Sequence, residues 1–238
     1  MTTTKAIERL FSLMALGIAA ASAPSASADP DPAIRPYSAE YEVRYRERDR
    51  GRSIRTVNFD VITSQYRFRS VTELTGFWLR LAIPRPIVEN SQFTSDNGRV
   101  TPIEFSYEDG TRGGDDSFNL DFAALNIESP SARTLDPGAL QVQIMLDAAR
   151  SVGARKYRVI DADGEQLYNY SIEGTELVET ALGTFNARIG MQQRDGSSRQ
   201  TLIWTAPELN HLPVRIEQRR NGETRLEFRL LSLEWLDE

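Results

Sequence analysis

Few side chains in this chain of 238 residues could carry out chemistry, and His211 is the first to consider. Imidazole titrates near neutral pH and binds metals, so the only histidine could serve as a general base or a ligand. The sequence has no cysteine, and a zinc site would need carboxylates for its other ligands. A catalytic triad would also depend on His211, yet no Gly-x-Ser-x-Gly elbow occurs. We expect His211 to lie in a loop between two strands, and we expect neither metal nor cofactor.

Paired aspartates are the next candidates, since two converging carboxylates can share acid–base work. Asp115 and Asp116 are adjacent, and neighbouring residues of a strand point to opposite faces, so these two would not converge. Asp161 and Asp163 precede a glycine, which is typical of a turn, and the further ligands of a calcium loop are missing. No glycine-rich phosphate loop is present. The sequence therefore predicts a protein that is not an enzyme.

An apolar stretch over residues 77–84 is the most site-like segment of the chain. Four residues have the i, i+3, i+4, i+7 spacing of an amphipathic helix, namely Leu74, Phe77, Trp78 and Leu81. That spacing is typical of a core helix. Leu79 and Ile83 fall outside the stripe, so the segment is apolar on more than one side and could instead form a lid on a lipophilic pocket. On that second interpretation the ligand-binding residues are Phe77, Trp78, Leu81 and Ile83.

The charge of the chain argues against one class of partner. The chain has 28 basic and 34 acidic residues, a net charge of −6. Proteins that bind nucleic acid usually present a basic face, so we expect no nucleic acid partner. The most arginine-rich segment, residues 44–52, is interleaved with Glu47 and Asp49, which is typical of the solvated end of a hairpin. Binding of this segment to anionic lipid or lipopolysaccharide is the alternative.

Two-residue alternation of apolar and polar side chains dominates the chain, and this is the period of a strand with one solvated face. The first such run consists of Tyr37, Ala39, Tyr41, Val43 and Tyr45, and similar runs recur towards the C-terminus. Five dipeptides that favour tight hairpin turns separate the runs: Asn97-Gly98, Asp109-Gly110, Asp163-Gly164, Asp195-Gly196 and Asn221-Gly222. The pattern predicts an antiparallel meander of about 10 to 12 strands.

One helix interrupts the predicted strands. Asp136 and Pro137 are suited to the cap and the first turn, and residues 139–150 carry apolar side chains at helical spacing. A sheet of so many twisted strands tends to curl or close. We therefore predict a mainly β protein, with a strongly curved antiparallel sheet or incomplete β-barrel, one central α-helix and a short apolar helical segment.

The first 28 residues have the pattern of a secretory signal peptide. Lys5 and Arg9 precede an apolar run over residues 10–21, and Ala26-Ser27-Ala28 fits the small-x-small cleavage pattern. The run is shorter than the roughly 20 residues that span a bilayer. We expect cleavage near Ala28 and export to the periplasm. The mature chain would have an extended tether at residues 29–36, one β-rich domain at residues 37–236 and no transmembrane segment.

One segment resembles a known family. Thr201-Leu202-Ile203-Trp204-Thr205-Ala206-Pro207-Glu208-Leu209, followed by Leu212-Pro213-Val214-Arg215-Ile216-Glu217, is similar to a signature of the domain of unknown function 3108 family. The resemblance covers residues 37–235 and implies an exported protein of Gram-negative bacteria, with no catalytic residues to transfer. We expect the signature residues to serve the architecture of two adjacent strands; they are Trp204, Pro207, Leu212 and Pro213.

Two main functional hypotheses follow, and an enzyme is a less supported third. The first is a non-enzymatic periplasmic protein that holds a lipophilic ligand or an acylated partner in the concave face of the sheet. Exported lipoprotein carriers, with a half-barrel covered by helices, provide the analogy. The second is an interaction or scaffold protein of the envelope with a packed core. A hollow concave face would favour the first and a filled one the second. The sequence does not determine the ligand, the protein partner or the oligomeric state.

Overall fold

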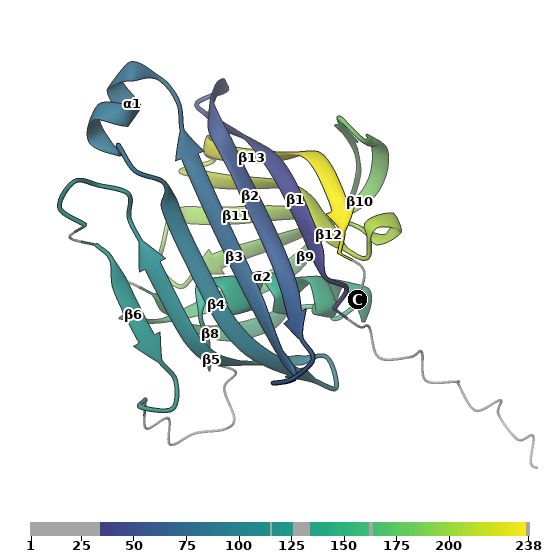
Figure 1. The fold of residues 1–238 in the computed structure, drawn as a ribbon. Helices are drawn as coiled ribbons and strands as arrows, with labels where there is room; N and C mark the ends of the chain where they lie inside the picture. The colour runs from purple at the N-terminus through teal and green to yellow at the C-terminus, as the bar shows by residue number, and fades with distance from the viewer. Residues whose placement is uncertain (1–33, 115, 126–133, 162–163, 237–238) are drawn as a thin grey trace, which may run out of the picture. The chain divides into compact units, whose positions relative to one another are not determined.

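Thirteen strands form one continuous sheet in the computed structural model, which describes residues 34–114, 116–125, 134–161 and 164–236 (Figure 1). The side chains of Asp49 and Trp78 also lie outside the description. Residues 31–238 form one compact unit, and every described residue belongs to it. The predicted leader and residues 29–33 of the predicted tether lie outside the described residues.

The sheet is a meander, as the alternation predicted. Its order is β6-β5-β4-β3-β2-β1-β13-β12-β11-β10-β9-β8-β7, so the chain starts in the middle and its last strand returns to pair with the first. All neighbouring strands are antiparallel except β7 and β8. The strands are β1 (Tyr37–Tyr45), β2 (Arg48–Asp60), β3 (Gln65–Leu74), β4 (Ile87–Asp96), β5 (Arg99–Glu108), β6 (Phe118–Asp121), β7 (Thr134–Leu135), β8 (Arg155–Asp161), β9 (Gly164–Thr180), β10 (Gly183–Arg194), β11 (Arg199–Ala206), β12 (Leu212–Arg220) and β13 (Glu223–Trp235).

The prediction of a mainly β, curved and unclosed sheet with two helices is confirmed. The described strands number one more than the upper prediction. The two-residue strand β7 is too short to show any alternation in the sequence, which accounts for the difference.

The central helix lies where the sequence placed it. The helix α2 (Pro137–Ala149) begins after Asp136, whose carboxylate accepts a hydrogen bond of 2.8 Å from the Ala139 amide. The short helix α1 (Phe77–Ala82) differs from its prediction at its start. Leu74 belongs to β3, and Gly76, with φ of 98°, separates the two elements. A single 3-10 turn, η1 (Pro207–Leu209), follows β11.

The strand registers define two rims of the curled sheet. Antiparallel pairing places the connections after β1, β3, β5, β10 and β12 along one edge, which we call the α1 rim. Its described residues are 46–47, 75–86, 109–114, 116–117, 195–198 and 221–222. The opposite rim holds the turns between β2 and β3, β4 and β5, and β9 and β10. At this opposite rim, Asn97 and Gly98 both have positive φ, as the predicted tight turn requires.

The helix α2 lies on the concave face, between β1–β5 and the remaining strands (Figure 1). It contacts β3, β4, β5 and β8, and ten of its 13 residues are buried. Its approach to the sheet is close at Gly138, where a Cβ would stand 2.7 Å from the Ser91 Cβ and 2.8 Å from the Phe68 Cδ1. This part of the interior is therefore filled by the protein itself.

Polar contacts fasten α2 at several points. The Gln143 side chain accepts a hydrogen bond from the Val100 amide at 2.9 Å and donates to the Gly98 carbonyl at 3.0 Å. Arg188 donates to the Ala148 carbonyl at 2.8 Å, at the C-terminal end of the helix. Because Gly98 lies in the β4–β5 turn, α2 runs towards the rim opposite α1.

Candidate functional site

A pocket of about 380 Å³ lies among β8–β13 at the α1 rim. Its lining combines arginine, amide and hydroxyl side chains with one aspartate, and consists of Asp161, Tyr168, Gln192, Arg194, Ser197, Arg199, Gln200, Thr201, Gln218, Arg219, Arg220 and Arg225. Five arginines against one carboxylate give the pocket a positive character, although the whole chain has a net charge of −6. Such a lining is suited to an anion.

Strand register explains why the arginines meet. Arg199 of β11 is directly opposite Arg220 of β12, and Thr201 is opposite Gln218 two residues further along the same strands. Residues at alternate positions share a face, so all four side chains lie on one side of the sheet. On the next strand pair, Arg194 of β10 is opposite Tyr168 of β9. The hairpin turns that the sequence predicted thus bring their flanking arginines to the same pocket.

Two of these arginines have no counter-charge among the described residues. Arg219 donates to the Glu217 carboxylate at 2.7 Å, and Arg225 pairs with Glu223 at 2.7 Å. Among the described residues, Arg199 and Arg220 form no ion pair and no side-chain hydrogen bond. Like charges directly opposite each other on neighbouring strands are destabilising. An anion bound between the two guanidinium groups would remove that repulsion.

A second hollow continues the positive surface along the rim. It has a volume of about 390 Å³ and is lined by Tyr45, Arg46, Arg220, Asn221 and Arg225. Arg220 and Arg225 line both hollows, so the two share a wall. The arginine-rich segment 44–52 lies on the β1–β2 hairpin, where the sequence placed it.

A larger pocket, of about 610 Å³, lies over β3–β6 and carries no such preference. Its charged side chains are Arg67, Glu104 and Asp121, which are of both signs. The remaining lining is mostly amide and hydroxyl. Nothing in this lining selects one class of ligand, and the arginine-lined pocket is the better-defined site.

Of the four residues expected to bind a lipophilic ligand, Phe77, Leu81 and Ile83 lie on the same rim but do not line the arginine pocket. Phe77 is 75% exposed and Leu81 is 51% exposed, which excludes the core interpretation for these two residues. Ile83 is half-buried and lies against Gly110. The side chain of Trp78 lies outside the described residues.

The signature residues lie at the β11–β12 connection and make contacts within the fold. The Trp204 indole donates to the Glu176 carboxylate at 2.9 Å, and the Arg215 guanidinium lies 4.6 Å from the centre of the indole ring. Pro207 opens η1, while Leu212 and Pro213 are buried. The Pro213 carbonyl accepts a hydrogen bond of 2.9 Å from the buried Tyr41 hydroxyl. These contacts favour the expected architectural role.

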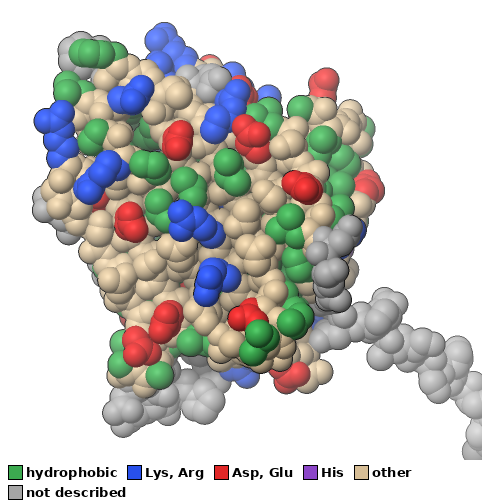
Figure 2. All heavy atoms as spheres, viewed as in Figure 1, with side chains coloured by type: hydrophobic (Ala, Val, Ile, Leu, Met, Phe, Trp, Pro, Cys, Tyr) green, Lys and Arg blue, Asp and Glu red, His purple; other side chains and the backbone are tan. Residues whose placement is uncertain are grey.

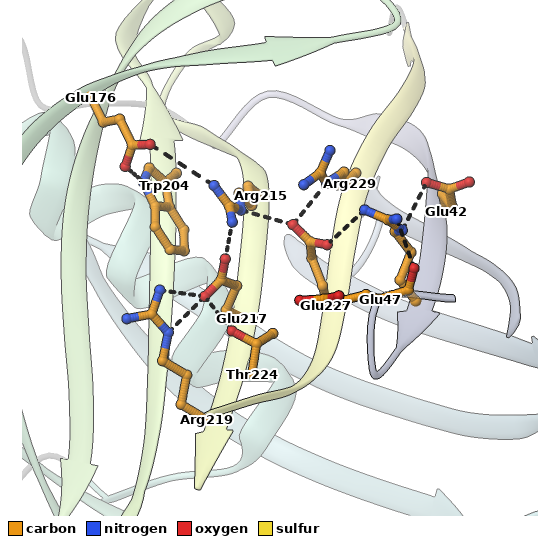
Figure 3. Close-up of polar contacts among 11 residues, drawn as sticks. Glu42, Glu47, Glu176, Trp204, Arg215, Glu217, Arg219, Thr224, Glu227 and Arg229 are labelled. Atoms are coloured by element: carbon orange, nitrogen blue, oxygen red, sulfur yellow. Dashed lines mark hydrogen bonds and ion pairs between the residues drawn. The ribbon is translucent and has the colours of Figure 1, made fainter. Parts of the chain in front are cut away.

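A network of buried carboxylates surrounds Arg215 (Figure 3). Arg215 pairs with Glu217 and, at 2.9 Å, with Glu227, which also accepts hydrogen bonds from Arg229 at 2.7 Å and Arg44 at 3.4 Å. A buried charge is costly unless it is paired and hydrogen-bonded, and these carboxylates meet both conditions. The arrangement therefore joins β1, β12 and β13. The sequence interpretation missed it, although Arg and Glu at alternate positions were a usable signal.

The described residues among those first considered for chemistry lie on different elements. His211 lies at the η1–β12 turn with φ of 58°, and burial, followed by the nearby Arg188 charge, lowers its pKa. Asp115 and Asp163 lie outside the described residues, and Asp116 donates its amide to Asp109. Asp161 accepts a hydrogen bond of 3.2 Å from Tyr168 in the arginine pocket. Within the described ranges, no three side chains of the types that ligate metals come together.

One carboxylate of the interior has a strongly altered protonation equilibrium. Asp136, at the start of α2, is fully buried, and its desolvation raises its pKa to about 7. Its oxygens accept hydrogen bonds from the Ala139 amide at 2.8 Å and the Ser91 hydroxyl at 2.9 Å, and these bonds oppose the shift. Asp136 is a fold residue rather than part of the arginine pocket.

Comparison with known proteins identifies a family and a fold. The family described as protein of unknown function (DUF3108) matches residues 40–229. A crystal structure of a beta-barrel-like protein of domain of unknown function DUF1849 from Brucella abortus is similar over 86% of this chain and 99% of its own, with 12% identity and a TM-score of 0.50. This likeness supports the barrel-like fold.

Two further solved structures resemble the chain less closely. MucB is similar over 86% of this chain and 55% of its own, with 8% identity and a TM-score of 0.38. A Bacteroides fragilis protein with a YmcC-like fold is similar over 85% of this chain and 97% of its own, with 13% identity and a TM-score of 0.40. No curated protein matches the sequence. Within the described residues, neither helix has the length and apolar composition needed to cross a membrane.

Proposed function

This chain belongs to the family of proteins of unknown function DUF3108, and we propose that it is a non-enzymatic binding protein that takes a ligand with an anionic group in its arginine-lined pocket. The observation that carries the proposal is the direct opposition of Arg199 and Arg220, neither of which has a counter-charge in the described part of the chain. Two arginines at this spacing can hold a phosphate or carboxylate group between them by charge-assisted hydrogen bonds.

The proposal keeps the ligand binding that the sequence suggested, but places the ligand in the arginine-lined pocket instead of the concave face. A lipophilic ligand in the concave face would need space that α2 occupies next to β3–β5. The pocket at the α1 rim is lined by polar and charged side chains. Arg188, which contacts the C-terminal end of α2, is not part of its lining. We therefore assign the anionic group of the ligand to the rim and leave the filled part of the interior to the fold.

The place of action in this proposal is the periplasm. Support comes from the signal-peptide pattern of residues 1–28, with its basic start, its short apolar run and its small residues before Asp29. The test is N-terminal sequencing of the chain recovered from a periplasmic extract. A mature protein that begins near Asp29 is expected, and full-length chain in the cytoplasm would contradict the proposal.

Ligand binding is tested by thermal unfolding in phosphate. A ligand that binds only the folded state raises the apparent stability by RT ln(1 + [L]/Kd), so inorganic phosphate should raise Tm above a chloride buffer of equal ionic strength. The double variant Arg199→Gln/Arg220→Gln should lose this response and, without phosphate, should be no less stable than the wild type. Arg99→Gln, at an exposed arginine of the opposite rim, is the matched control and should respond as the wild type does. A wild-type Tm that phosphate does not change would overturn the proposal.

A second candidate is the envelope scaffold with a packed core. The observation in its favour is the burial of ten of the 13 residues of α2. Crosslinking in intact cells followed by purification should then recover one protein partner in fixed proportion. A monomer that recovers no partner would exclude this candidate.

A further inference from the structure

The helix α1 presents large apolar side chains to solvent. Phe77 is 75% exposed and Leu81 is 51% exposed. Residues four apart lie on the same face of a helix, so the two side chains form one apolar surface. Neighbouring apolar side chains that remain exposed mark interaction surfaces.

Arginines surround this apolar surface. Arg80 lies within α1, Arg85 follows it, and Arg112 lies on the loop between β5 and β6; all three are exposed. In the described part of the chain none of them forms an ion pair. Among the described residues, the exposed acidic side chains nearby in the sequence are Glu108, at the end of β5, and Asp116, in the loop.

One acidic residue beside Arg85, Asp109, is turned into its own loop. The Asp109 carboxylate accepts hydrogen bonds from the Thr111 amide at 2.9 Å, the Thr111 hydroxyl at 2.8 Å and the Asp116 amide at 3.2 Å. Its oxygens are therefore engaged by the loop, and Asp109 is buried. Among the described exposed side chains of this corner, three arginines therefore stand against the two carboxylates of Glu108 and Asp116.

The corner is held in place by backbone contacts. The Arg85 amide donates to the Gly110 carbonyl at 3.1 Å, and the Arg85 side chain donates to the Thr111 carbonyl. Gly110 has φ of 71°, and a Cβ there would stand 2.5 Å from the Arg85 carbonyl oxygen and 2.9 Å from Ile83. Since this close approach needs glycine, the segment that follows α1 is fixed to the β5–β6 loop.

The apolar surface and the arginine pocket share one rim. The helix α1 stands out beyond the strands at the upper end of the sheet in Figure 1. Figure 2 shows apolar and basic side chains gathered at that end of the molecule. The Gly76 Cβ position is 3.4 Å from an Arg50 nitrogen, which links α1 to the arginine-rich β1–β2 hairpin.

We infer that the α1 rim docks on an anionic phospholipid bilayer, with Phe77 and Leu81 entering the interfacial region and Arg80, Arg85 and Arg112 facing lipid phosphates. The inference rests on the proposed function, because the bilayer would supply the anionic headgroup that Arg199 and Arg220 bind. Apolar side chains beside cationic ones are the chemistry of proteins that lie on a membrane surface. Arginine near such a surface gains from the negative potential of anionic lipids.

A bilayer fits this surface better than a second protein does. A six-residue helix with two exposed apolar side chains offers far less than the roughly 800 Å² per partner of a stable protein interface. A bilayer needs no complementary groove, and its phosphates complement the three arginines, which form no ion pair within the described ranges. Charge complementarity therefore favours an anionic bilayer over a second copy of the chain as the partner of this surface.

The test is flotation of the full mature chain with lipid vesicles. Vesicles of phosphatidylcholine and phosphatidylglycerol at about 3:1 should carry the protein upward, and pure phosphatidylcholine should not. The double variant Phe77→Ser/Leu81→Ser should bind the anionic vesicles about tenfold more weakly. Leu177→Ser is the matched control, because Leu177 is 71% exposed and lies on the β9–β10 hairpin at the opposite rim. It should float as the wild type does.

The outcomes separate this inference from the proposed function. Protein that responds to inorganic phosphate but ignores anionic vesicles overturns the docking and leaves the proposed function standing. Protein that floats but shows no phosphate response overturns the headgroup assignment, since the pocket then binds no anion. The docking is also overturned if the protein floats equally well with neutral and anionic vesicles. The same holds if Leu177→Ser weakens flotation as much as Phe77→Ser/Leu81→Ser does. A dimer in light scattering that Phe77→Ser/Leu81→Ser abolishes, without flotation, would instead assign the surface to a second copy. Circular dichroism and the phosphate response verify that the variants fold.

Discussion

Arg199 of β11 and Arg220 of β12 are cross-strand partners on one face of the sheet, and no carboxylate among the described residues pairs with either. Opposite charges are the stabilising choice at such positions, whereas like charges are destabilising. The arrangement therefore lowers stability at the wall of a pocket of about 380 Å³, where an anion would reverse the effect.

Charge reversal at Arg220 should separate stability from binding. Arg220→Glu would create an opposite-charge pair with Arg199 and raise the free energy of unfolding by roughly 0.5 kcal/mol, while abolishing the phosphate response. Arg99→Glu is the matched control, because Arg99 is opposite Asp96 and its reversal creates a like-charge pair. It should lower stability slightly and keep the phosphate response. Urea unfolding with and without phosphate measures both the stability and the phosphate response. An Arg220→Glu variant less stable than the wild type would contradict the unpaired opposition of the two arginines.

Asp136 should make stability depend on pH. Its folded pKa of about 7 lies above 3.8, the ordinary pKa of an aspartate. The stabilising contribution of the neutral form is therefore complete below pH 4 and is lost as pH rises through 7. Asp136→Asn keeps the capping oxygen and cannot ionise. Between pH 4 and 8, the wild type should lose on the order of 4 kcal/mol relative to this variant. Urea unfolding at several pH values gives the difference, and a constant difference would refute the shift.

Gln143 should be essential for the attachment of α2 to the β4–β5 turn. Gln143→Leu keeps the side chain buried but leaves the Val100 amide and the Gly98 carbonyl without their partner. An unsatisfied buried polar group costs about 1–3 kcal/mol, so we expect a loss of roughly 3 kcal/mol. Hydrogen exchange of the Val100 amide should accelerate more than that of amides in β12. Unchanged exchange at Val100 would show that the contact is dispensable.

Gly138 should tolerate no side chain. Gly138→Ala would place a Cβ against Ser91 and Phe68, so α2 would have to move away from the sheet, at a cost of about 1–3 kcal/mol. Gly153→Ala is the control, since a Cβ at that position meets nothing within 4 Å. It should be neutral or stabilising by up to about 1 kcal/mol. Thermal and urea unfolding should therefore show a lower free energy of unfolding for Gly138→Ala and an unchanged or higher one for Gly153→Ala. Equal values for the two variants would contradict the prediction.

Local patterns predicted most of the elements. Alternation along Tyr37–Tyr45 corresponds to β1, and Asp136 caps α2 at the expected residue. These features depend on neighbouring residues only, because strand period and helix capping are short-range properties. The start of α1 was misplaced, since Leu74 satisfies both the helical stripe and the last position of β3.

The candidate site could not be predicted in the same way. Arg199 and Arg220 belong to different strands, and their opposition depends on the register of β11 and β12. That pairing contains a bulge between Trp204 and Thr205, and the next contains one between Gln218 and Arg219. Each bulge adds a residue to one strand and changes which side chains share a face. Counting alternate residues along β11–β13 from one end of a strand therefore assigns some side chains to a different face than counting from the other end.

The sequence alone predicts a β meander with one capped central helix, because hydrophobic period, turn dipeptides and capping residues act locally. The three-dimensional fold was needed to show that α2 fills part of the concave face, that Glu217 and Glu227 are buried among arginines, and that the hairpin arginines meet at one rim. These outcomes depend on the sum of many strand registers and on the curl of the whole sheet. Such long-range geometry has no counterpart in any short stretch of residues.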